Sequence, residues 1–388
     1  MLKLGILGYG GRLRGVAALM RDFGVPFTLA AVADPRWEPL QAECPELADT
    51  RMYPEAEALL AAHQAGGEGH LDGVMIGTRC SLHAPLACLV APTNLPLFLE
   101  KPIATSYEQV RALQQAFASY TSEVVVSFPL RLTPLALAAK EILDSGRLGS
   151  LEHIQAWNNV PYGDCYFGAW YRDNDETGGL FLQKATHDFD YLSYLLGQRP
   201  RWVAAMNSRR IYGGDQPVGL RCDDCDEQEA CLESPFNRYY RRWLTPRVEP
   251  SGNACMFAQD ARNEDSGSAL LEFENGVQAS YSQNFFARNG AGARGARFFG
   301  YHGTVEFDWY TDVLKVWMHH SPRVETVRFE GAQHSHGGGD RELVYDFLQV
   351  MQGKGHSRSP LEAGIVSVLT CLAARESAAT RQFVEVVV

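Results

Sequence analysis

Short apolar runs alternate with polar, helix-forming stretches along the first third of the chain. The apolar runs are typical of buried strands, and the stretches between them, such as ALLAAHQ and SYEQVRALQQAFASY, are typical of helices. Strands that alternate with helices predict a parallel, doubly wound α/β sheet. The expected strands are LKLGILG (2–8), FTLAAVAD (27–34), LDGVMIGT (71–78), LPLFLEKP (95–102) and EVVVSFPL (123–130).

The first expected strand ends in the glycine-rich stretch GYGGRL. Gly8 and Gly10 fit the first two positions of G-x-G-x-x-G, where a tight turn brings the backbone close to a pyrophosphate at a helix N-terminus. Leu13 stands at the third position, so the helix and strand are expected to lie slightly further apart. An ordinary turn is the alternative interpretation, and the following strand and Asp34 favour the dinucleotide one.

Asp34 ends the second expected strand, about 20 residues beyond the glycines, where a carboxylate accepts the ribose 2′-hydroxyl. The same carboxylate would repel a 2′-phosphate. NAD is therefore favoured over NADP, although the nearby Arg36 weakens that preference.

LFLEKP places Glu100 and Lys101 at the carboxyl end of the fourth expected strand. Ligands bind at that edge of open α/β sheets. A lysine near a nicotinamide can donate a hydrogen bond to a carbonyl or alkoxide and help to move a proton during hydride transfer. A solvent-facing residue at the end of a strand is the alternative.

QKATHDFD predicts the start of a helix near residue 184. At roughly 100° per residue, such a helix has an apolar and a polar side. His187 lies off the apolar side, which favours a functional role over that of a hydrogen-bonded core histidine. The apolar side carries Phe189, Leu192 and Leu196, and the other side carries Gln183, Lys184, His187, Asp190, Tyr191 and Tyr194.

These motifs together resemble the Gfo/Idh/MocA family of NAD(P)-dependent oxidoreductases, on the basis of GYGGRL, Asp34, GTRCSLHAPLA, LEKP and GG-x7-HDFD. LEFENGVQASYSQNF, YHGTVEFD and HGGGDRELVYDFL extend the resemblance over nearly the whole chain. It implies a Rossmann domain over residues 1–127. Residues 128–388 would form a substrate-binding and oligomerisation α/β domain with an open, mostly antiparallel sheet.

The resemblance also implies hydride transfer between NAD(P) and a hydroxyl or carbonyl of a sugar, polyol or cyclitol. Lys101 and His187 correspond to the family's reaction centre. Family members usually carry an aspartate four residues before the histidine. Here that residue is Gln183, whose amide cannot act as an acid or base. Lys184 and Asp190 are expected to compensate and, with Gln183, to position the substrate.

Other candidates rest on weaker signals. Arg131 resembles a family position near the active site, with a structural ion pair as the alternative. Trp170 is suited to stack on a sugar, although aromatic packing explains it equally well. His336, between flexible glycines, is a candidate substrate contact, with a mobile loop as the alternative. The expected cofactor contacts are Gly8, Gly10, Gly11, Arg12, Leu13, Asp34, Thr78, His83, Glu100 and Lys101.

Two other functions remain open from the sequence. One is a glycosidase that uses tightly bound NAD for transient oxidation, as some family relatives do. The other is a non-catalytic nucleotide-binding protein, supported only by the missing aspartate at Gln183. The family resemblance further implies a homodimer or homotetramer.

Composition and charge narrow the class of protein. The 388 residues predict two or three domains, and 46% hydrophobic with 21% charged residues is typical of a globular chain. A net charge of -11 argues against a general nucleic-acid binder. No apolar run approaches the roughly 20 residues of a membrane span, so a cytoplasmic protein without a membrane partner is expected.

Four of the nine cysteines form a pattern of their own. Cys222, Cys225 and Cys231 give C-x2-C-x5-C, and Cys255 follows 24 residues later. Four thiolates could close a tetrahedral structural zinc site. Unligated cysteines and a disulfide are the alternatives. A catalytic metal is not expected, because the family's hydride chemistry does not require one.

Overall fold

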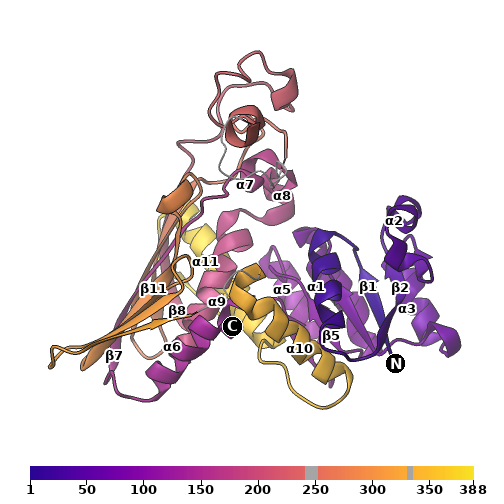
Figure 1. Ribbon diagram of the computed structural model, residues 1–388, viewed down its shortest axis with the longest axis horizontal. Helices are drawn as coiled ribbons and strands as arrows, with labels where there is room; N and C mark the ends of the chain where they lie inside the picture. The colour runs from indigo at the N-terminus through magenta and orange to yellow at the C-terminus, as the bar shows by residue number, and fades with distance from the viewer. Residues whose placement is uncertain (241–251, 330–334) are drawn as a thin grey trace.

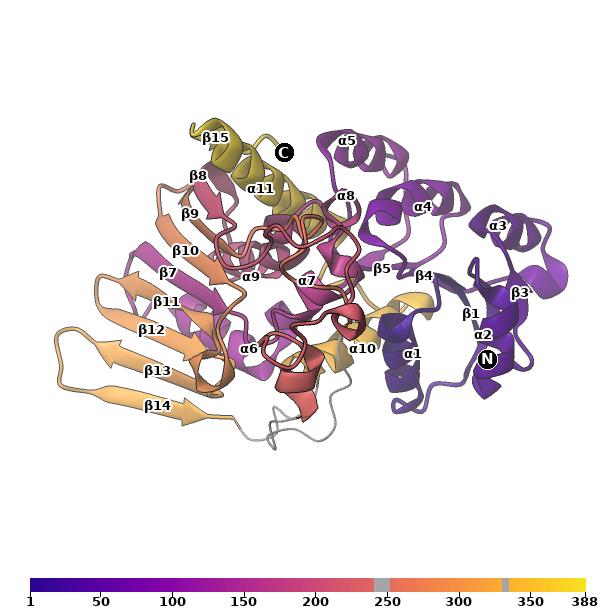
Figure 2. The same cartoon turned by 90° about the horizontal axis from the view of Figure 1, so that it is seen from above.

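The computed structural model describes residues 1–240, 252–329 and 335–388. A six-stranded sheet from the first part of the chain and a nine-stranded sheet from the second lie on opposite sides of a layer of helices (Figures 1 and 2). This arrangement confirms the expected α/β fold class. No helix among these residues is long and apolar enough to cross a membrane.

The six-stranded sheet is parallel throughout, in the order β3-β2-β1-β4-β5-β6. All five expected strands are present but shorter. The residues at their carboxyl ends turn out of the sheet, and β4, β5 and β6 also begin one or two residues later than expected. Strand β3 was not expected from the sequence. The strands are β1 (Leu2–Leu7), β2 (Phe27–Ala33), β3 (Arg51–Tyr53), β4 (Gly73–Ile76), β5 (Leu97–Leu99) and β6 (Val124–Val126).

One helix from the far end of the chain covers this first sheet. Helix α10 (Gly339–Met351) packs beside α1, and its Leu343 and Phe347 share a core with Leu4 and Phe98. The C-terminal part of the chain therefore contributes to the core of the first domain. The boundary at residue 127 stays a prediction. The other helices of this part are α1 (Gly11–Arg21), α2 (Trp37–Glu43), α3 (Ala56–Gln64), α4 (His83–Val90) and α5 (Tyr107–Ala116).

The nine-stranded sheet has the order β14-β13-β12-β11-β7-β10-β9-β8-β15, and only the β7–β10 pair is parallel. Figure 2 shows the described helices gathered on one of its faces. The strands are β7 (Leu151–Asn159), β8 (Pro200–Ser208), β9 (Ser266–Phe273), β10 (Gln278–Asn284), β11 (Ala293–Gly300), β12 (Gly303–Asp308), β13 (Val313–Met318), β14 (Val324–Arg328) and β15 (Val384–Glu385). The helices are α6 (Pro134–Asp144), α7 (Cys165–Gly168), α8 (Asn174–Thr177), α9 (Thr186–Leu196) and α11 (Leu361–Thr380).

Helix α9 differs from the two-sided helix expected from the sequence. A π-helical turn, Phe181–Ala185, precedes it, and every residue from 181 to 192 is buried. The long helix α11 packs against both α9 and the π turn. The polar residues of QKATHDFD therefore need partners inside the protein or a ligand.

Candidate active site

A pocket of about 250 Å³ lies where the carboxyl ends of β1, β4, β5 and β6 face the second domain. It collects ten of the residues expected from the sequence, from segments far apart in the chain. Arg12, Thr78, His83, Glu100 and Lys101 line its nucleotide-domain wall, and Trp170, Gln183, Lys184, His187 and His336 line the opposite wall. Cys80, Tyr162, Cys165 and Tyr166 also line it, and no spacing in the sequence pointed to them.

The glycine-rich loop fits a dinucleotide. Gly8 has a φ of +84°, and a Cβ there would lie 2.6 Å from Thr78 Cγ2, so this turn requires glycine. A Cβ added at Gly11 would meet no atom within 4 Å, so the space at the start of α1 is open to a phosphate. Asp34 lies beside the loop, because its Oδ2 accepts the backbone N–H of Tyr9 at 3.0 Å.

A glycine at the end of the neighbouring strand compensates for the missing third glycine of the motif. Leu13 is fully buried against Gly77, where a Cβ would lie 2.4 Å from Leu13 Cγ. The leucine of α1 thus occupies the space that a side chain at the end of β4 would need. Sequence reasoning that considered only the G-x-G-x-x-G positions missed this compensation.

Arg12 is the centre of an ion network that contains two buried carboxylates. Its Nε donates to Glu100 Oε1 at 2.7 Å, and its Nη2 donates to Asp340 Oδ1 at 2.7 Å. Asp340 Oδ2 in turn contacts Nδ1 of His336 at 2.8 Å. Burial alone would raise the pKa of Glu100, but the Arg12 guanidinium lowers it below its usual range. Arg12, expected as a cofactor contact, therefore also joins the nucleotide domain to α10.

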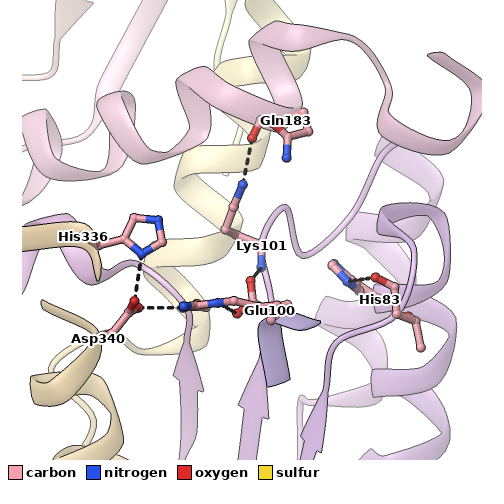
Figure 3. Close-up of polar contacts among 9 residues, drawn as sticks. His83, Glu100, Lys101, Gln183, His336 and Asp340 are labelled. Carbon is pink, nitrogen blue, oxygen red and sulfur yellow. Dashed lines mark hydrogen bonds and ion pairs between the residues drawn. The ribbon is translucent and has the colours of Figure 1, made fainter. Parts of the chain in front are cut away.

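Lys101 extends from the end of β5 toward the second domain, where its Nζ donates to the backbone carbonyl of Gln183 at 3.0 Å (Figure 3). Burial lowers the pKa of Lys101 to about 8, and the nearby Lys184 cation acts in the same direction. A lysine with such a pKa exchanges protons readily near neutral pH.

Two buried polar atoms in this pocket lack protein partners. Within the described ranges, Gln183 Oε1 and His187 Nδ1 have no hydrogen-bond partner, although both residues are buried. Burial lowers the pKa of His187 well below its usual range, and Lys101 is the next contributor. His187 is therefore neutral. Unpartnered polar atoms that line a pocket are suited to bind the hydroxyl groups of a ligand.

Lys184 lies in the π turn on the same wall. Its Nζ donates to Tyr162 Oη at 2.6 Å and lies 5.7 Å from the centre of the Tyr166 ring. Burial lowers the pKa of Lys184 to about 7, and Arg294 contributes further. A buried amine with such a pKa gains or loses its proton readily near neutral pH.

Some expected substrate contacts lie outside this pocket or are already engaged. Asp190 and Arg131 form a buried ion pair, with Arg131 Nε donating to Asp190 Oδ2 at 3.0 Å, and neither lines the pocket. This geometry corresponds to the structural alternative for Arg131. His83 contacts two backbone carbonyls through its ring nitrogens, and Trp170 is stacked on Tyr171 at 3.9 Å.

The zinc expectation is not supported by the cysteine segment. Cys222, Cys225, Cys231 and Cys255 line one small cavity, but no group of three or more His, Cys, Asp or Glu in the described ranges is arranged to hold a metal ion. All four thiols are free. Burial, followed by the neighbouring cysteines, raises the pKa of Cys222 to about 11, which keeps that thiol protonated.

Comparison with known proteins agrees with this architecture. Residues 2–128 match a family described as an oxidoreductase family with an NAD-binding Rossmann fold, and residues 136–306 match the GFO/IDH/MocA C-terminal domain. The protein YteT of Bacillus subtilis (strain 168) is 25% identical over 376 residues, which cover 86% of this chain and 85% of YteT.

Two relatives carry names that state an activity. An inositol 2-dehydrogenase of Rhizobium meliloti (strain 1021) is 29% identical over 204 residues, 53% of this chain and 58% of the relative. The solved structure of a levoglucosan dehydrogenase with NADH and levoglucosan superposes with a TM-score of 0.74 at 19% identity, covering 99% of both chains. With its two matched domains, this chain belongs to the Gfo/Idh/MocA family of oxidoreductases.

Proposed function

We propose that the protein transfers a hydride between NAD and a hydroxyl or carbonyl group of a sugar, polyol or cyclitol, with Lys101 and His187 at the reaction centre. The observation that carries this proposal is that the two residues come from different domains and line one pocket at the carboxyl edge of the Rossmann sheet. The inositol and levoglucosan dehydrogenases named above support the substrate class.

Bound NAD would supply the hydride acceptor for oxidation of a CH–OH group. The hydroxyl proton released in the same reaction would go to the neutral amine of Lys101, whose pKa of about 8 suits that transfer. In the reverse direction the Lys101 ammonium would donate a proton to the carbonyl oxygen. The neutral His187 and the Gln183 amide would hold further hydroxyl groups through the two atoms that lack protein partners.

The preference for NAD over NADP is part of the same proposal. The cofactor would be held by the open loop at Gly10 and Gly11, with the ribose hydroxyls on Asp34. Asp34 Oδ1 also accepts the backbone N–H of Arg36 at 2.9 Å, which fixes the carboxylate beside the loop.

A substrate screen tests the function. Neutral and acidic sugars, polyols and cyclitols would be assayed for NADH absorbance with the native protein and with Lys101→Ala. We expect Lys101→Ala to lower kcat by ~100-fold to 10000-fold. The rate of oxidation should rise with pH through about 8, because the neutral amine is the reactive form.

Lys354→Ala, at an exposed position after α10, is the matched control and should keep the native rate. A substrate that Lys101→Ala oxidises as fast as the native protein would show that the reaction centre is wrong. Hydrolysis of a glycoside without net NADH would favour the glycosidase alternative.

We also propose that copies of the chain associate through the sheet face opposite the helices, as a homodimer or homotetramer. Met206 and Leu270 of β8 and β9 are 60% and 56% exposed on that sheet, and burying them would be favourable. Light scattering of the native protein and of Leu270→Glu checks this, since the substitution should shift the mass toward the monomer. A native protein that is already a monomer would contradict it.

A further inference from the structure

Lys184 is a buried lysine whose amine is paired with a neutral group. Only 6% of the residue is exposed, and its Nζ has Tyr162 Oη as a neutral partner at 2.6 Å. No carboxylate of the described residues forms an ion pair with it. Because an unpaired buried charge is costly, such an amine either loses its proton or takes an anionic partner.

The neighbouring carboxylates are all engaged with arginines. Asp188 accepts from Arg294 Nε at 2.8 Å, and Glu100 accepts from Arg12 Nε at 2.7 Å. Asp190, two residues beyond Asp188, is paired with Arg131. Since each acid already has a guanidinium, none of them serves as the counter-ion of Lys184.

Unpartnered polar atoms near Lys184 indicate a ligand site and not a packed core. Gln183 Oε1 and His187 Nδ1, on the same wall of the pocket, are buried polar atoms without a protein partner in the described ranges. Tyr162, the partner of Lys184, also lines the pocket and is 44% exposed as a residue, so this neighbour of the amine reaches the protein surface. A structural lysine would not be surrounded by several unfilled hydrogen-bonding positions.

We propose that the sugar accepted by this site carries a carboxylate, as a hexuronate or hexonate does, and that Lys184 binds this carboxylate in place of the Tyr162 hydroxyl. The inference rests on the proposed function. The phosphates of NAD belong at the glycine loop on the other wall, so they do not supply the anion. Lys101, the other lysine of the pocket, is assigned to the reacting hydroxyl, which leaves Lys184 to balance the single charge of a carboxylate and not the double charge of a phosphate.

Binding of the carboxylate would restore the full charge of Lys184. Burial holds its pKa at about 7, and Arg294 lowers it while Asp188 and Cys165 oppose that effect. An anion within hydrogen-bond distance raises the pKa of a lysine, so binding draws in a proton above pH 7. The other titratable groups that face Lys184 or its partner are Lys101, His187, Tyr162, Tyr166 and Tyr310.

A matched panel of ligands tests the proposal by binding and by turnover. Galacturonate, glucuronate and gluconate would be compared with galactose, glucose and glucitol, and with galactose 6-phosphate, by calorimetry on the protein loaded with NADH. The same ligands would be assayed with NAD for NADH formation. We expect at least one acid to bind more tightly than its neutral partner, and Lys184→Met to reduce that ratio by about 30-fold or more.

Lys184→Arg should keep most of the preference because it keeps the charge, and Lys354→Met should keep all of it. Titration with NADH checks that each variant still folds and binds the nucleotide. The proposal is overturned if no acid binds more tightly than its neutral partner, if the phosphate binds best, or if Lys184→Met weakens neutral and acidic sugars equally. Tight, Lys184-dependent binding of an acid without NADH formation would support this proposal and reject the proposed function.

Discussion

The two walls of the pocket are built with opposite charge arrangements. On the nucleotide-domain wall, Arg12 lies between Glu100 and Asp340, so that the cation and both carboxylates have partners. On the second-domain wall, Lys184 has a neutral phenol as its partner, and Gln183 has a buried oxygen without one. The Arg12 network is complete within the protein, whereas the groups at Lys184 and Gln183 are not.

The difference separates groups that hold the architecture from groups that await a ligand. A network in which every charge has a partner fixes its members in place and holds α10 against the Rossmann sheet. Unpartnered groups cost stability unless a ligand completes them. Changes to the Arg12 network should therefore affect folding, and changes around Lys184 and Gln183 should affect the choice of ligand.

The largest expected effect comes from breaking the complete wall. Arg12→Met would leave the Glu100 and Asp340 carboxylates buried without their cation, and should lower the free energy of unfolding at pH 7 by about 3 kcal/mol. Both carboxylates have a lowered pKa in the native protein, so the stability they contribute is present at neutral pH and is lost in acid. The deficit of the variant should therefore shrink as the pH falls below about 4.5, the ordinary pKa of Glu100.

Urea denaturation at several pH values measures this deficit. Arg36→Met is the matched control, because Arg36 is exposed and its ion pair with Glu43 is 3.5 Å long. It should change the free energy of unfolding by less than about 0.5 kcal/mol. Equal losses for the two variants would mean that the network does not stabilise the fold.

A smaller effect should follow from adding a carboxylate to the incomplete wall. Gln183→Glu keeps the shape of the side chain and introduces a negative charge into the pocket that also holds Lys184 and Lys101. It should weaken the binding of a hexuronate by about tenfold, because like charges repel, and change the binding of the neutral sugar much less. Calorimetry with galacturonate and galactose checks this, with Gln114→Glu on an exposed position of α5 as the control. Equal weakening of both ligands would indicate a general disturbance of the pocket.

Much of the fold could be predicted from the chain itself. The segments that become β1, β2, β4, β5 and β6 are continuous apolar runs, which are typical of buried strands. Strand β3 (Arg51–Tyr53) was missed because its residues form no apolar run and Arg51 is exposed at the edge of the sheet. The second domain was expected only through its resemblance to a family, since its topology depends on pairings between distant strands.

Many residues of the candidate site could be predicted from the sequence, but the ion pairs between them could not. The strand-end rule indicated Lys101 and the glycine loop. Nothing local indicated that Arg12 contacts Asp340, 328 residues away, or that Asp188 contacts Arg294, 106 residues away. Because the acids beside Lys184 in the sequence are committed to distant arginines, the isolation of Lys184 became visible only in three dimensions.

The most direct test of the account is the proton count that accompanies binding of a hexuronate. Galacturonate, or the acid that binds best in the panel, would be titrated into the NADH-loaded protein near pH 8 in two buffers of different ionisation enthalpy. The native protein should take up more protons than Lys184→Met does, because burial lowers the pKa of Lys184 to about 7 and the arriving anion raises it again. Equal proton uptake by the native protein and Lys184→Met would contradict the assignment of Lys184 as the carboxylate's partner.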